Sequence, residues 1–493
     1  MTEQAERAQK RRDLLEKAQR SPSYKYTVLA ITAIGIFMST LDGSIVNVAL
    51  PTISTAFSAS LTTLGWVVTA YLLAISSLLP TMGRAADLYG RKAVYSLGFI
   101  VFIIGSALCG LSWNVGALII FRVIQAIGAA MLMANGMAIV TAVFPAKERG
   151  RALGISGTVV AAGSLTGPAL GGLIVGALNW RYIFYINLPI GIIGALLGFT
   201  LLPEQPRSHE GRFDFLGSGL FVIGLVPLLL ALSEGQDIGW GSPIVYVMLV
   251  LAVAGLTAFY YVERRTAQPM VDLSLFRQPI FTIGNAAGML SYTVNFFSVF
   301  LIPFYLTQVR GLPPELVGLM MTPVPAVMFF VAPLSGWLSD RIGYVFLTSA
   351  GMIILTLGMV ALSGLKEATG FVSVALRLAL VGIGMGLFTS PNNSSIMGAV
   401  HTSKLGLTSG LIATVRNVGM MLGVAISASL FQNRLGHAEA YLQARFGPLT
   451  PALENQAFVT SLHTTFLIAA GIGVLGIIIS SVRAAEGPRP QPR

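Results

Sequence analysis

Long apolar stretches recur along the chain from Tyr26 to Val482, and each is long enough to cross a lipid bilayer as a helix. A helix needs about 17 to 25 mainly apolar residues to span the hydrocarbon core. Only 10% of the 493 residues are charged and 54% are hydrophobic, whereas soluble domains carry about 25% charged residues. The chain therefore cannot cover its surface with polar groups, and the bilayer is the solvent for most of it.

Charged or Pro- and Gly-rich loops divide these stretches into about fourteen predicted helices. They cover residues 26–49, 62–82, 93–112, 116–144, 152–176, 183–203, 214–233, 243–263, 279–306, 314–337, 346–364, 371–395, 405–432 and 457–482. With the N-terminus inside, the loops on that side and the two tails hold 23 Lys and Arg residues, and the opposite loops hold five. Because Lys and Arg accumulate on the cytoplasmic side of membrane proteins, we expect both termini to be cytoplasmic.

The rest of the composition excludes several kinds of site. A net charge of +11 would suggest nucleic acid or another acidic partner in a soluble protein, but here the charge follows the loops, so no nucleic-acid partner is expected. The one cysteine, Cys109, excludes an internal disulfide and a cysteine-cluster metal site. The four histidines are scattered without metal-ligand spacing. We therefore expect no metal, no cofactor and no enzymatic activity.

A repeated motif indicates two similar halves. The loop after the second predicted span reads GRAADLYGRK and the loop after the tenth contains GWLSDRIG, so that Asp87 is matched by Asp340 at an offset of 253 residues. A fainter match pairs Arg122 with Arg377 at an offset of 255 residues. Two six-helix halves separated by a two-helix insertion at residues 214–263 explain both offsets. Parallel repeats of this kind allow two bundles to rock around a central site.

The repeat divides this all-α polytopic membrane protein into five predicted segments. They are a cytoplasmic N-terminal tail (1–25), an N-terminal six-helix bundle (26–203), two inserted helices with an interfacial linker (204–278), a C-terminal six-helix bundle (279–482) and a cytoplasmic C-terminal tail (483–493).

Four stretches carry a family resemblance. They are LDGSIVNVALP (41–51), GRAADLYGRK (83–92), RVIQAIG (122–128) and GSLTGPALGG (163–172). Together they resemble the motifs of the major facilitator superfamily, and specifically its fourteen-span drug:proton antiporter branch, although Ala85, Leu88 and Ala126 depart from the usual residues. The resemblance implies the major facilitator fold, with two six-helix bundles plus two inserted helices, in the plasma (inner) membrane of a bacterium, as a monomer.

The resemblance also implies a set of gating residues. Asp87 would face a helix N-terminus of the opposite half at the cytoplasmic side, where the helix dipole favours negative charge. Glycines recur every four residues from Gly163 to Gly171 and place a smooth stripe on one helix face; this stripe is either a contact that seals the two halves or ordinary tight packing. The expected gating residues are Gly83, Asp87, Gly90, Arg91, Gly163, Gly167, Pro168, Gly171, Gly172 and Asp340.

Asp42 is the only carboxylate away from the ends of the predicted spans. An acid near the bilayer centre costs about 2.5–3.5 kcal/mol on insertion scales, so a retained one is a candidate functional residue. Arg122 is expected at a similar depth, about 9 Å below the outer surface against about 13 Å for Asp42. Burial favours the neutral acid and a nearby guanidinium favours the charged one, so their separation would change proton affinity. We expect the two to form a proton-coupling pair; the alternatives are structural roles for each.

Polar, Met and aromatic residues on the inner faces of both halves are expected to line the cargo site, because Met and aromatic side chains adapt to varied apolar ligands. They are Asn47, Gln125, Met133, Asn135, Tyr292, Asn295, Phe296 and Asn392. The alternative for each, taken singly, is a packing role. Without a second intramembrane carboxylate, a lipophilic monocation or a neutral amphiphile is expected rather than a dication.

The sequence therefore predicts a secondary transporter that exports amphipathic drugs or dyes in exchange for protons by alternating access. The expected partners are an amphipathic small molecule, protons and the lipid bilayer, with the proton gradient as the energy source. The main alternative is an exporter or flippase of an endogenous lipid, peptide or antibiotic on the same fold. A membrane enzyme would need a cluster of polar catalytic groups, and a channel would need a symmetric polar ring or filter.

Overall fold

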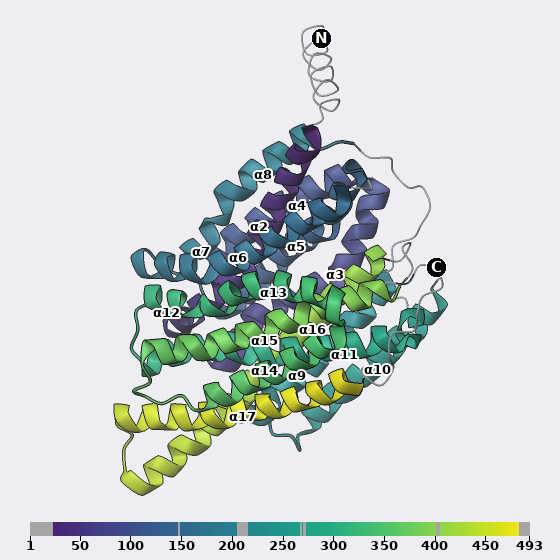
Figure 1. Ribbon diagram of the computed structural model, residues 1–493. Helices are drawn as coiled ribbons and strands as arrows, with labels where there is room; N and C mark the ends of the chain where they lie inside the picture. Colours follow the sequence, from purple (N-terminus) through teal and green to yellow (C-terminus); the bar gives the residue numbers. More distant parts are fainter. Residues whose placement is uncertain are drawn as a thin grey trace.

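The computed structural model describes residues 23–145, 148–204, 215–266, 269, 273–400 and 405–482, and its regular elements in these ranges are all helices (Figure 1). Within these ranges, thirteen helices are long and apolar enough to cross a membrane, and Gly219–Leu232 is a shorter apolar stretch. The predicted all-α polytopic fold is confirmed. The two predicted tails lie outside the described residues, apart from residues 23–25.

The helices form two halves separated by an inserted pair. The first half contains α2 (Tyr24–Phe57), α3 (Leu61–Tyr89), α4 (Arg91–Gly110), α5 (Val115–Val143), α6 (Arg149–Ala177), α7 (Tyr182–Tyr185) and α8 (Asn187–Leu201). The inserted pair is α9 (Phe215–Ile238) and α10 (Pro243–Arg265). The second half contains the 3₁₀ helix η2 (Leu273–Arg277), α11 (Pro279–Phe304), the π-helical turn η3 (Tyr305–Val309), α12 (Pro314–Met321), α13 (Pro323–Ile342), α14 (Tyr344–Ser363), α15 (Phe371–Gly398), α16 (Leu405–Phe446) and α17 (Pro451–Val482).

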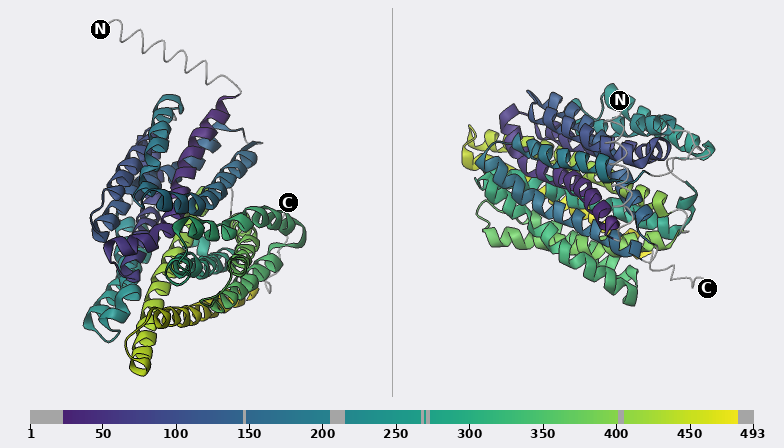
Figure 2. Two further views of the ribbon diagram at one scale, coloured as in Figure 1. Left: turned by 90° about the vertical axis from the view of Figure 1, so that its left-hand side faces the viewer. Right: turned by 90° about the horizontal axis from the view of Figure 1, so that it is seen from above.

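Helix contacts repeat from one half to the other. In the first half, α4 packs on α5 and α8, α3 packs on α5, and α2 packs on α6. In the second half, α14 packs in the same way on α15 and α17, α13 on α15, and α11 on α16. Single glycines also separate equivalent helices: Gly90 (φ 100°) lies between α3 and α4, and Gly343 (φ 85°) between α13 and α14. Positive φ favours glycine because it has no Cβ. The two predicted bundles thus share one helix arrangement, and Figure 2 shows them side by side.

Polar caps and prolines set where several helices begin. The side chain of Asn114 accepts the N–H of Ala117 at 2.7 Å before α5, and Ser60 accepts that of Thr63 at 3.2 Å before α3. Pro243 occupies the first turn of α10, where a missing N–H costs nothing. Lipid offers no hydrogen bonds to the free N–H groups of a helix end, so these caps fix the ends near the membrane surface.

Helix α16 is longer than predicted. The predicted span ended at residue 432, but the helix continues through Arg434 and Arg445 to Phe446, and Gly447 follows with φ 86°. Its 42 residues span about 63 Å, roughly twice the hydrocarbon thickness. The extension is rich in Ala, Leu, Gln, Arg and Glu, which favour helix without burial. The fall in hydropathy after residue 432 therefore marks where α16 leaves the apolar region of the membrane, and the helix itself ends later, at Phe446.

The two halves meet at the end of the bundle opposite Gly90. Helix α6 packs on α12 there, where a Cβ on Gly172 would lie 2.9 Å from the Cα of Gly318. Helix α3 packs on α16, where a Cβ on Gly65 would lie 3.1 Å from Cγ1 of Val424. One apolar core contains side chains of α2, α3, α6, α11, α12 and α16. The halves are therefore closed against each other at that end.

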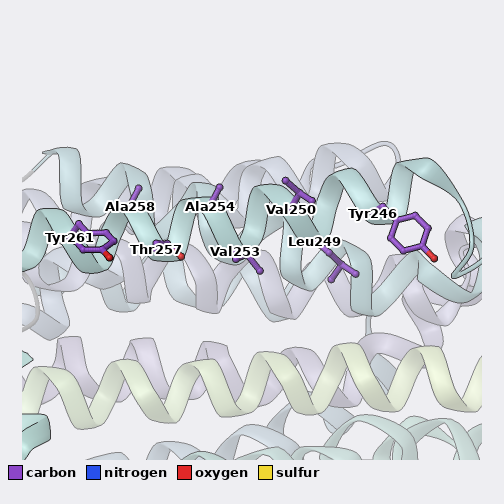
Figure 3. A pocket seen from close by; sticks show the side chains of 8 residues that line it. All are labelled: Tyr246, Leu249, Val250, Val253, Ala254, Thr257, Ala258 and Tyr261. Atoms are coloured by element: carbon purple, nitrogen blue, oxygen red, sulfur yellow. The ribbon is translucent and has the colours of Figure 1, made fainter.

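The inserted pair lies on the outside of the bundles. Helix α9 contacts α3 and α16, and its partner α10 is exposed along most of its length. A shallow groove of about 630 Å³ runs along α10 from Tyr246 to Tyr261 (Figure 3). Every residue that lines it belongs to this one helix, and none is a predicted site residue. The groove has the apolar character of a lipid-facing surface.

We expect Gly384→Ala to destabilise the second half. A Cβ at this position would lie 2.7 Å from the Cα of Leu355 and 2.9 Å from the carbonyl oxygen of Gly351, so α14 and α15 would have to separate. Such overpacking costs about 1–3 kcal/mol. Gly410→Ala in α16, where no atom lies within 4 Å, is the matched control and should stabilise by up to about 1 kcal/mol through helix propensity. Thermal unfolding in detergent measures both, and equal shifts in Tm would contradict the close contact.

Candidate functional site

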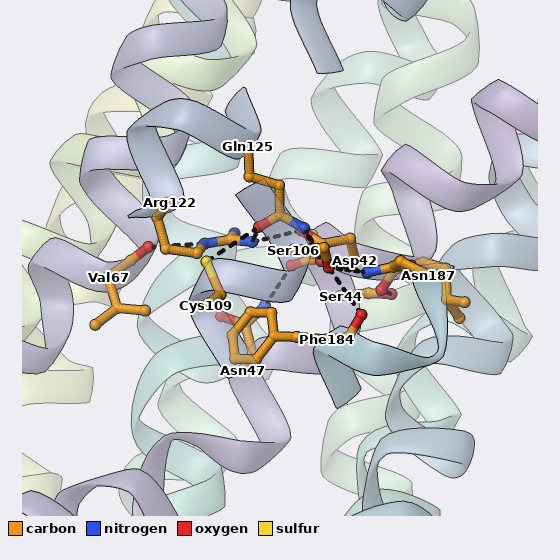
Figure 4. A network of polar contacts seen from close by, with 12 residues as sticks. Asp42, Ser44, Asn47, Val67, Ser106, Cys109, Arg122, Gln125, Phe184 and Asn187 are labelled. Carbon is orange, nitrogen blue, oxygen red and sulfur yellow. Dashed lines mark hydrogen bonds and ion pairs between the residues drawn. The ribbon is translucent and has the colours of Figure 1, made fainter. Parts of the chain in front are cut away.

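Asp42 and Arg122 form an ion pair inside the first half (Figure 4). Asp42 lies in the middle of α2 and Arg122 in the second turn of α5. The Nη1 group of Arg122 donates to Oδ2 of Asp42 at 2.5 Å, and the two side chains are 1% and 0% exposed. Buried charges of this kind persist only when they are paired and their remaining hydrogen-bonding groups are satisfied.

Two amides complete the coordination of Asp42. Gln125 and Asn187 donate their side-chain N–H groups to Oδ1 at 2.8 and 3.0 Å. Both amides also donate to the hydroxyl of Ser106, at 3.1 and 3.0 Å, and that hydroxyl donates to the carbonyl oxygen of Phe184 at 2.8 Å. The described partners of Asp42 are all donors. A protonated acid would need an acceptor for its own O–H, so this arrangement fits the ionised carboxylate.

Arg122 is also held by contacts with groups other than the carboxylate. Its Nε donates to the carbonyl oxygen of Val67 at 3.3 Å, and its Nη1 also donates to Oε1 of Gln125 at 2.7 Å. The guanidinium lies 3.8 Å from the centre of the Tyr71 ring, a cation–π distance. Arg122 therefore has partners that do not depend on the charge of Asp42, and it can stay in place when that charge is removed.

The equivalent of Arg122 in the second half is a leucine. Gly105 packs on Gln125 as Gly358 packs on Val381, so these two partners are equivalent. Counting back three residues from Val381 gives Leu378, which is buried, whereas the sequence comparison had paired Arg122 with Arg377. One residue turns a helix by about 100°, so Arg377 points to a different side and that pairing was wrong.

Asp42, Ser106 and Asn187 also have apolar equivalents. Gly163 packs on the carbonyl oxygen of Phe37 as Gly419 packs on that of Met289. Five residues further along each helix, Asp42 corresponds to Val294. The same reasoning from the contacts of α4 and α8 pairs Ser106 with Met359 and Asn187 with Ala469. Val294, Leu378, Val381, Met359 and Ala469 are all buried in the main apolar core.

The residues predicted to line the cargo site do not form one cavity. Gln125 belongs to the Asp42 network, and Asn47 lies one turn beyond Asp42 with its amide donating to the carbonyl oxygen of Gly43. Asn135 donates to the carbonyl oxygen of Met131 at 2.8 Å within α5, and Met133 packs on the core of the first half.

In the second half, two of the predicted cargo residues share a cleft. Tyr292 and Asn392 line it together, from α11 and α15. Asn295 and Phe296 are buried outside this cleft, and Phe296 belongs to the apolar core that joins the halves.

The predicted glycine stripe packs within the first half. Gly163, Gly167 and Gly171 all face α2, where added Cβ atoms would meet Thr40, Ser44 and Ile45. Gly172, one position further, contacts the other half through α12, and Pro168 and Gly176 also lie against that helix, at Gly318 and Glu315. The stripe and the inter-half contact therefore lie on neighbouring faces of α6, which continues as a helix through Pro168.

The remaining gating residues lie around the single-glycine turns. Gly90 has the positive φ of such a turn, and Gly83 has one neighbour at 3.9 Å, the Cβ of Ala134. Arg91 donates to the carbonyl oxygen of Ala138 at 3.5 Å. The side chains of Asp87 and Asp340 lie outside the described part of the chain.

Comparison with known proteins decides the family. The model of the Major Facilitator Superfamily matches residues 32–424. The chain belongs to the major facilitator superfamily. It is therefore a transporter and not an enzyme, as the sequence predicted. Its relatives include the riboflavin transporter RibZ of Clostridioides difficile, 37% identical over 92% of this chain and 97% of that protein. The multidrug resistance protein Stp of Mycobacterium tuberculosis is 37% identical over 82% and 75%, and the multidrug transporter MdtP of Bacillus subtilis is 33% identical over 86% and 78%.

Solved facilitator structures share the fold. A bacterial homologue of the human lysosomal transporter Spinster, in an inward-facing conformation, aligns with a TM-score of 0.71 at 18% identity, over 96% of this chain and 100% of that one. The xylose transporter XylE of Escherichia coli, in a partially occluded inward-open conformation, aligns with a TM-score of 0.59 at 14% identity, over 95% and 100%.

Sequence reasoning missed four members of the facilitator's polar network: Tyr71, Ser106, Asn187 and Cys109, whose thiol donates to Oε1 of Gln125 at 3.7 Å. Asn187 and Ser106 are amide and hydroxyl side chains within apolar stretches, where most such groups bond their own helix backbone. Their spacing from Asp42 in sequence carries no sign that they meet it. The short helix α7 and the turn into α8 place Asn187 at the network, and the apolar stretch around it gave no sign of that turn.

We expect Arg122→Gln to lower stability strongly, by about 3–5 kcal/mol, because it leaves the buried carboxylate of Asp42 without its counter-ion. The double variant with Asp42→Asn removes both charges and should recover most of that loss. Thermal unfolding of the purified variants in detergent measures the coupling. Losses that simply add would show that the two side chains do not act as a pair.

Proposed function

We propose that this facilitator exports amphipathic small molecules across the plasma membrane in exchange for protons, by alternating access of its two halves. The supporting observation is Asp42, fully buried between two amides and Arg122 in the middle of a membrane-spanning helix. A carboxylate in such a place is a candidate for reversible protonation. Multidrug transporters among the relatives support the cargo class.

Protonation of Asp42 would weaken the contacts that hold its helix. The neutral acid loses the Coulomb attraction of Arg122, and one oxygen stops accepting from its donors. Arg122 keeps its contacts with the Tyr71 ring and the carbonyl oxygen of Val67, so its side chain stays in place. Helix α2 would then be free to move away from α5. Because α2 also packs on α6, which carries the contact to the other half, the charge of Asp42 can bias the balance between conformations.

In the predicted orientation, Gly90 faces the cytoplasm, so the two halves are closed toward the outside. An ionised Asp42 in this conformation fits a transporter that has released its proton inward and receives cargo from the cytoplasm. Binding of cargo and return to the outward-facing conformation would then allow a proton to enter from outside. Each positive charge that enters contributes about 2.3 kcal/mol per 100 mV of membrane potential.

A second candidate cargo is a flavin. The riboflavin transporter RibZ is 37% identical and matches nearly the full length of both chains, so the match includes the inserted helices and both halves. Displacement of a transported dye by riboflavin would support this cargo. A dye whose transport is unchanged by saturating riboflavin would argue against it.

Asp42→Asn is expected to abolish uphill efflux of a fluorescent dye from energised vesicles, because the amide cannot take up a proton. Exchange of labelled for unlabelled dye without a gradient should persist, since it needs only the conformational change. An uncoupler should abolish uphill efflux by the parent protein. Concentrative transport by the Asn variant in response to ΔpH would disprove the role of Asp42.

Asn187→Leu is expected to move the midpoint of the transport–pH profile to higher pH. Asn187 donates to Oδ1 of Asp42 and stabilises its charged form, so its loss favours the protonated acid. Asn47→Leu is the matched control: its amide donates to Gly43 and not to Asp42, so the midpoint should stay in place whatever happens to the rate. Equal midpoints in the two variants would remove Asn187 from the coupling site.

A further inference from the structure

The second half carries a polar group of its own where the first half is apolar. Asn285 of α11, Asn392 of α15 and Arg416 of α16 line one cleft. By the helix equivalences described above, their counterparts in the first half are Ala33, Gly136 and Val160, none of which can donate a side-chain hydrogen bond. None of these three polar side chains is therefore a requirement of the shared fold.

We propose that this cleft is the cargo's polar subsite, and that Arg416 binds an anionic or strongly accepting oxygen group of the cargo, such as a carboxylate, an imide or a ring carbonyl. The proposal rests on the proposed export function and names the chemistry of its cargo.

The cleft is small and its walls approach closely. It holds about 10 Å³, room for roughly one water molecule. Asn392 donates to the carbonyl oxygen of Gly284 at 3.1 Å, and a Cβ on Gly288 would lie 3.4 Å from the same amide nitrogen. Both glycines line the cleft. A single oxygen group of the cargo, rather than the whole molecule, is what fits.

Arg416 supplies the charge of this cleft. Its Nε is buried and has no hydrogen-bond partner, and no carboxylate of the described chain lies within salt-bridge distance of it. An arginine has five N–H donors and no acceptor. Leaving such a group unpaired within a membrane-spanning helix is costly, and an acceptor brought by the cargo would relieve that cost.

The charge balance of the two halves favours a cargo that is not cationic. Asp42 is neutralised by Arg122 at 2.5 Å. Arg377 also has a buried nitrogen without a hydrogen-bond partner, but it lies outside the cleft, so Arg416 is the arginine whose unbalanced charge faces the cleft. A lipophilic monocation, which the sequence alone favoured, would meet only repulsion at this cleft. Tyr292 lies in the same wall and offers an aromatic surface to a planar ring system. A planar, acceptor-rich aromatic molecule satisfies both features.

Binding of two planar probes of opposite character tests the proposal. Riboflavin is neutral and carries imide and ring carbonyl acceptors, whereas ethidium is a monocation without carbonyl groups. Dissociation constants are measured from dye fluorescence on the full-length protein in lipid nanodiscs, with no ion gradient. Variants are Arg416→Gln, Arg416→Lys and, as the matched control, Arg377→Gln, an intramembrane arginine of the same half outside the cleft. Tm values show that each variant is folded.

Arg416→Gln is expected to weaken riboflavin binding at least about tenfold and ethidium binding less than about twofold, with Arg416→Lys within about threefold of the parent for riboflavin. Arg377→Gln should bind both probes as the parent does. The proposal is overturned if the parent binds no riboflavin, if Arg416→Gln leaves riboflavin binding unchanged, or if it weakens both probes equally. Asp42→Asn in the same assay keeps the two proposals apart: retained binding with lost uphill efflux supports both, whereas retained uphill efflux overturns only the proton-coupling role.

Discussion

The first half of this facilitator is built around a carboxylate that the membrane would otherwise exclude. Asp42 is tolerated because donors from α5 and α8 reach it, and Ser106 of α4 holds those donors in place. Four helices must therefore converge within hydrogen-bond distance of one point. The close approach of α4 to α5, where a Cβ on Gly105 would lie 2.8 Å from Cβ of Gln125, follows from that convergence. The packing of these helices and the charge of Asp42 therefore depend on each other: the charge needs the donors that the packing brings, and the donors need the helices close together.

The internal repeat shows which features belong to the fold and which to function. Close glycine contacts recur in both halves, as at Gly105 and Gly358, because two helix backbones cannot approach without them. The side chains at the equivalent central positions do not recur. Where the first half has a buried polar network, the second has an apolar core with Val294 at the position of Asp42. Under the proposed mechanism, protonation of Asp42 would weaken polar contacts in the first half, whereas the second half has no charged group at the equivalent position to respond.

Much of the fold could be predicted from the sequence, and only part of the site. Apolar length and loop charge gave the helices and their order, because the bilayer imposes both. Asp42 and Arg122 stood out because charge is rare inside membranes. Asn187 and Ser106 did not, because neutral polar residues are common in such helices and only the tertiary fold brings them to one carboxylate. The pairing of Arg122 with Arg377 was wrong by one residue, since matching letters ignores which face of the helix a side chain occupies. The role proposed for Arg416 could not be predicted either, because only the tertiary fold brings residues of α11, α15 and α16 to one cleft.

The sign of the cargo's charge decides how much of the membrane potential this arrangement can use. In the described chain, Asp42 is the only carboxylate near the middle of its helix, so one proton entering per cycle is the simplest exchange. Export of a monocation against that proton moves no net charge, and only the pH gradient drives it. Export of a neutral molecule moves one charge inward, and export of an anion moves two, each worth about 2.3 kcal/mol per 100 mV. If Arg416 binds the cargo as proposed, its charge disfavours the one cargo class whose export would gain nothing from the membrane potential, so the proposed subsite and the energetics of exchange favour the same cargo.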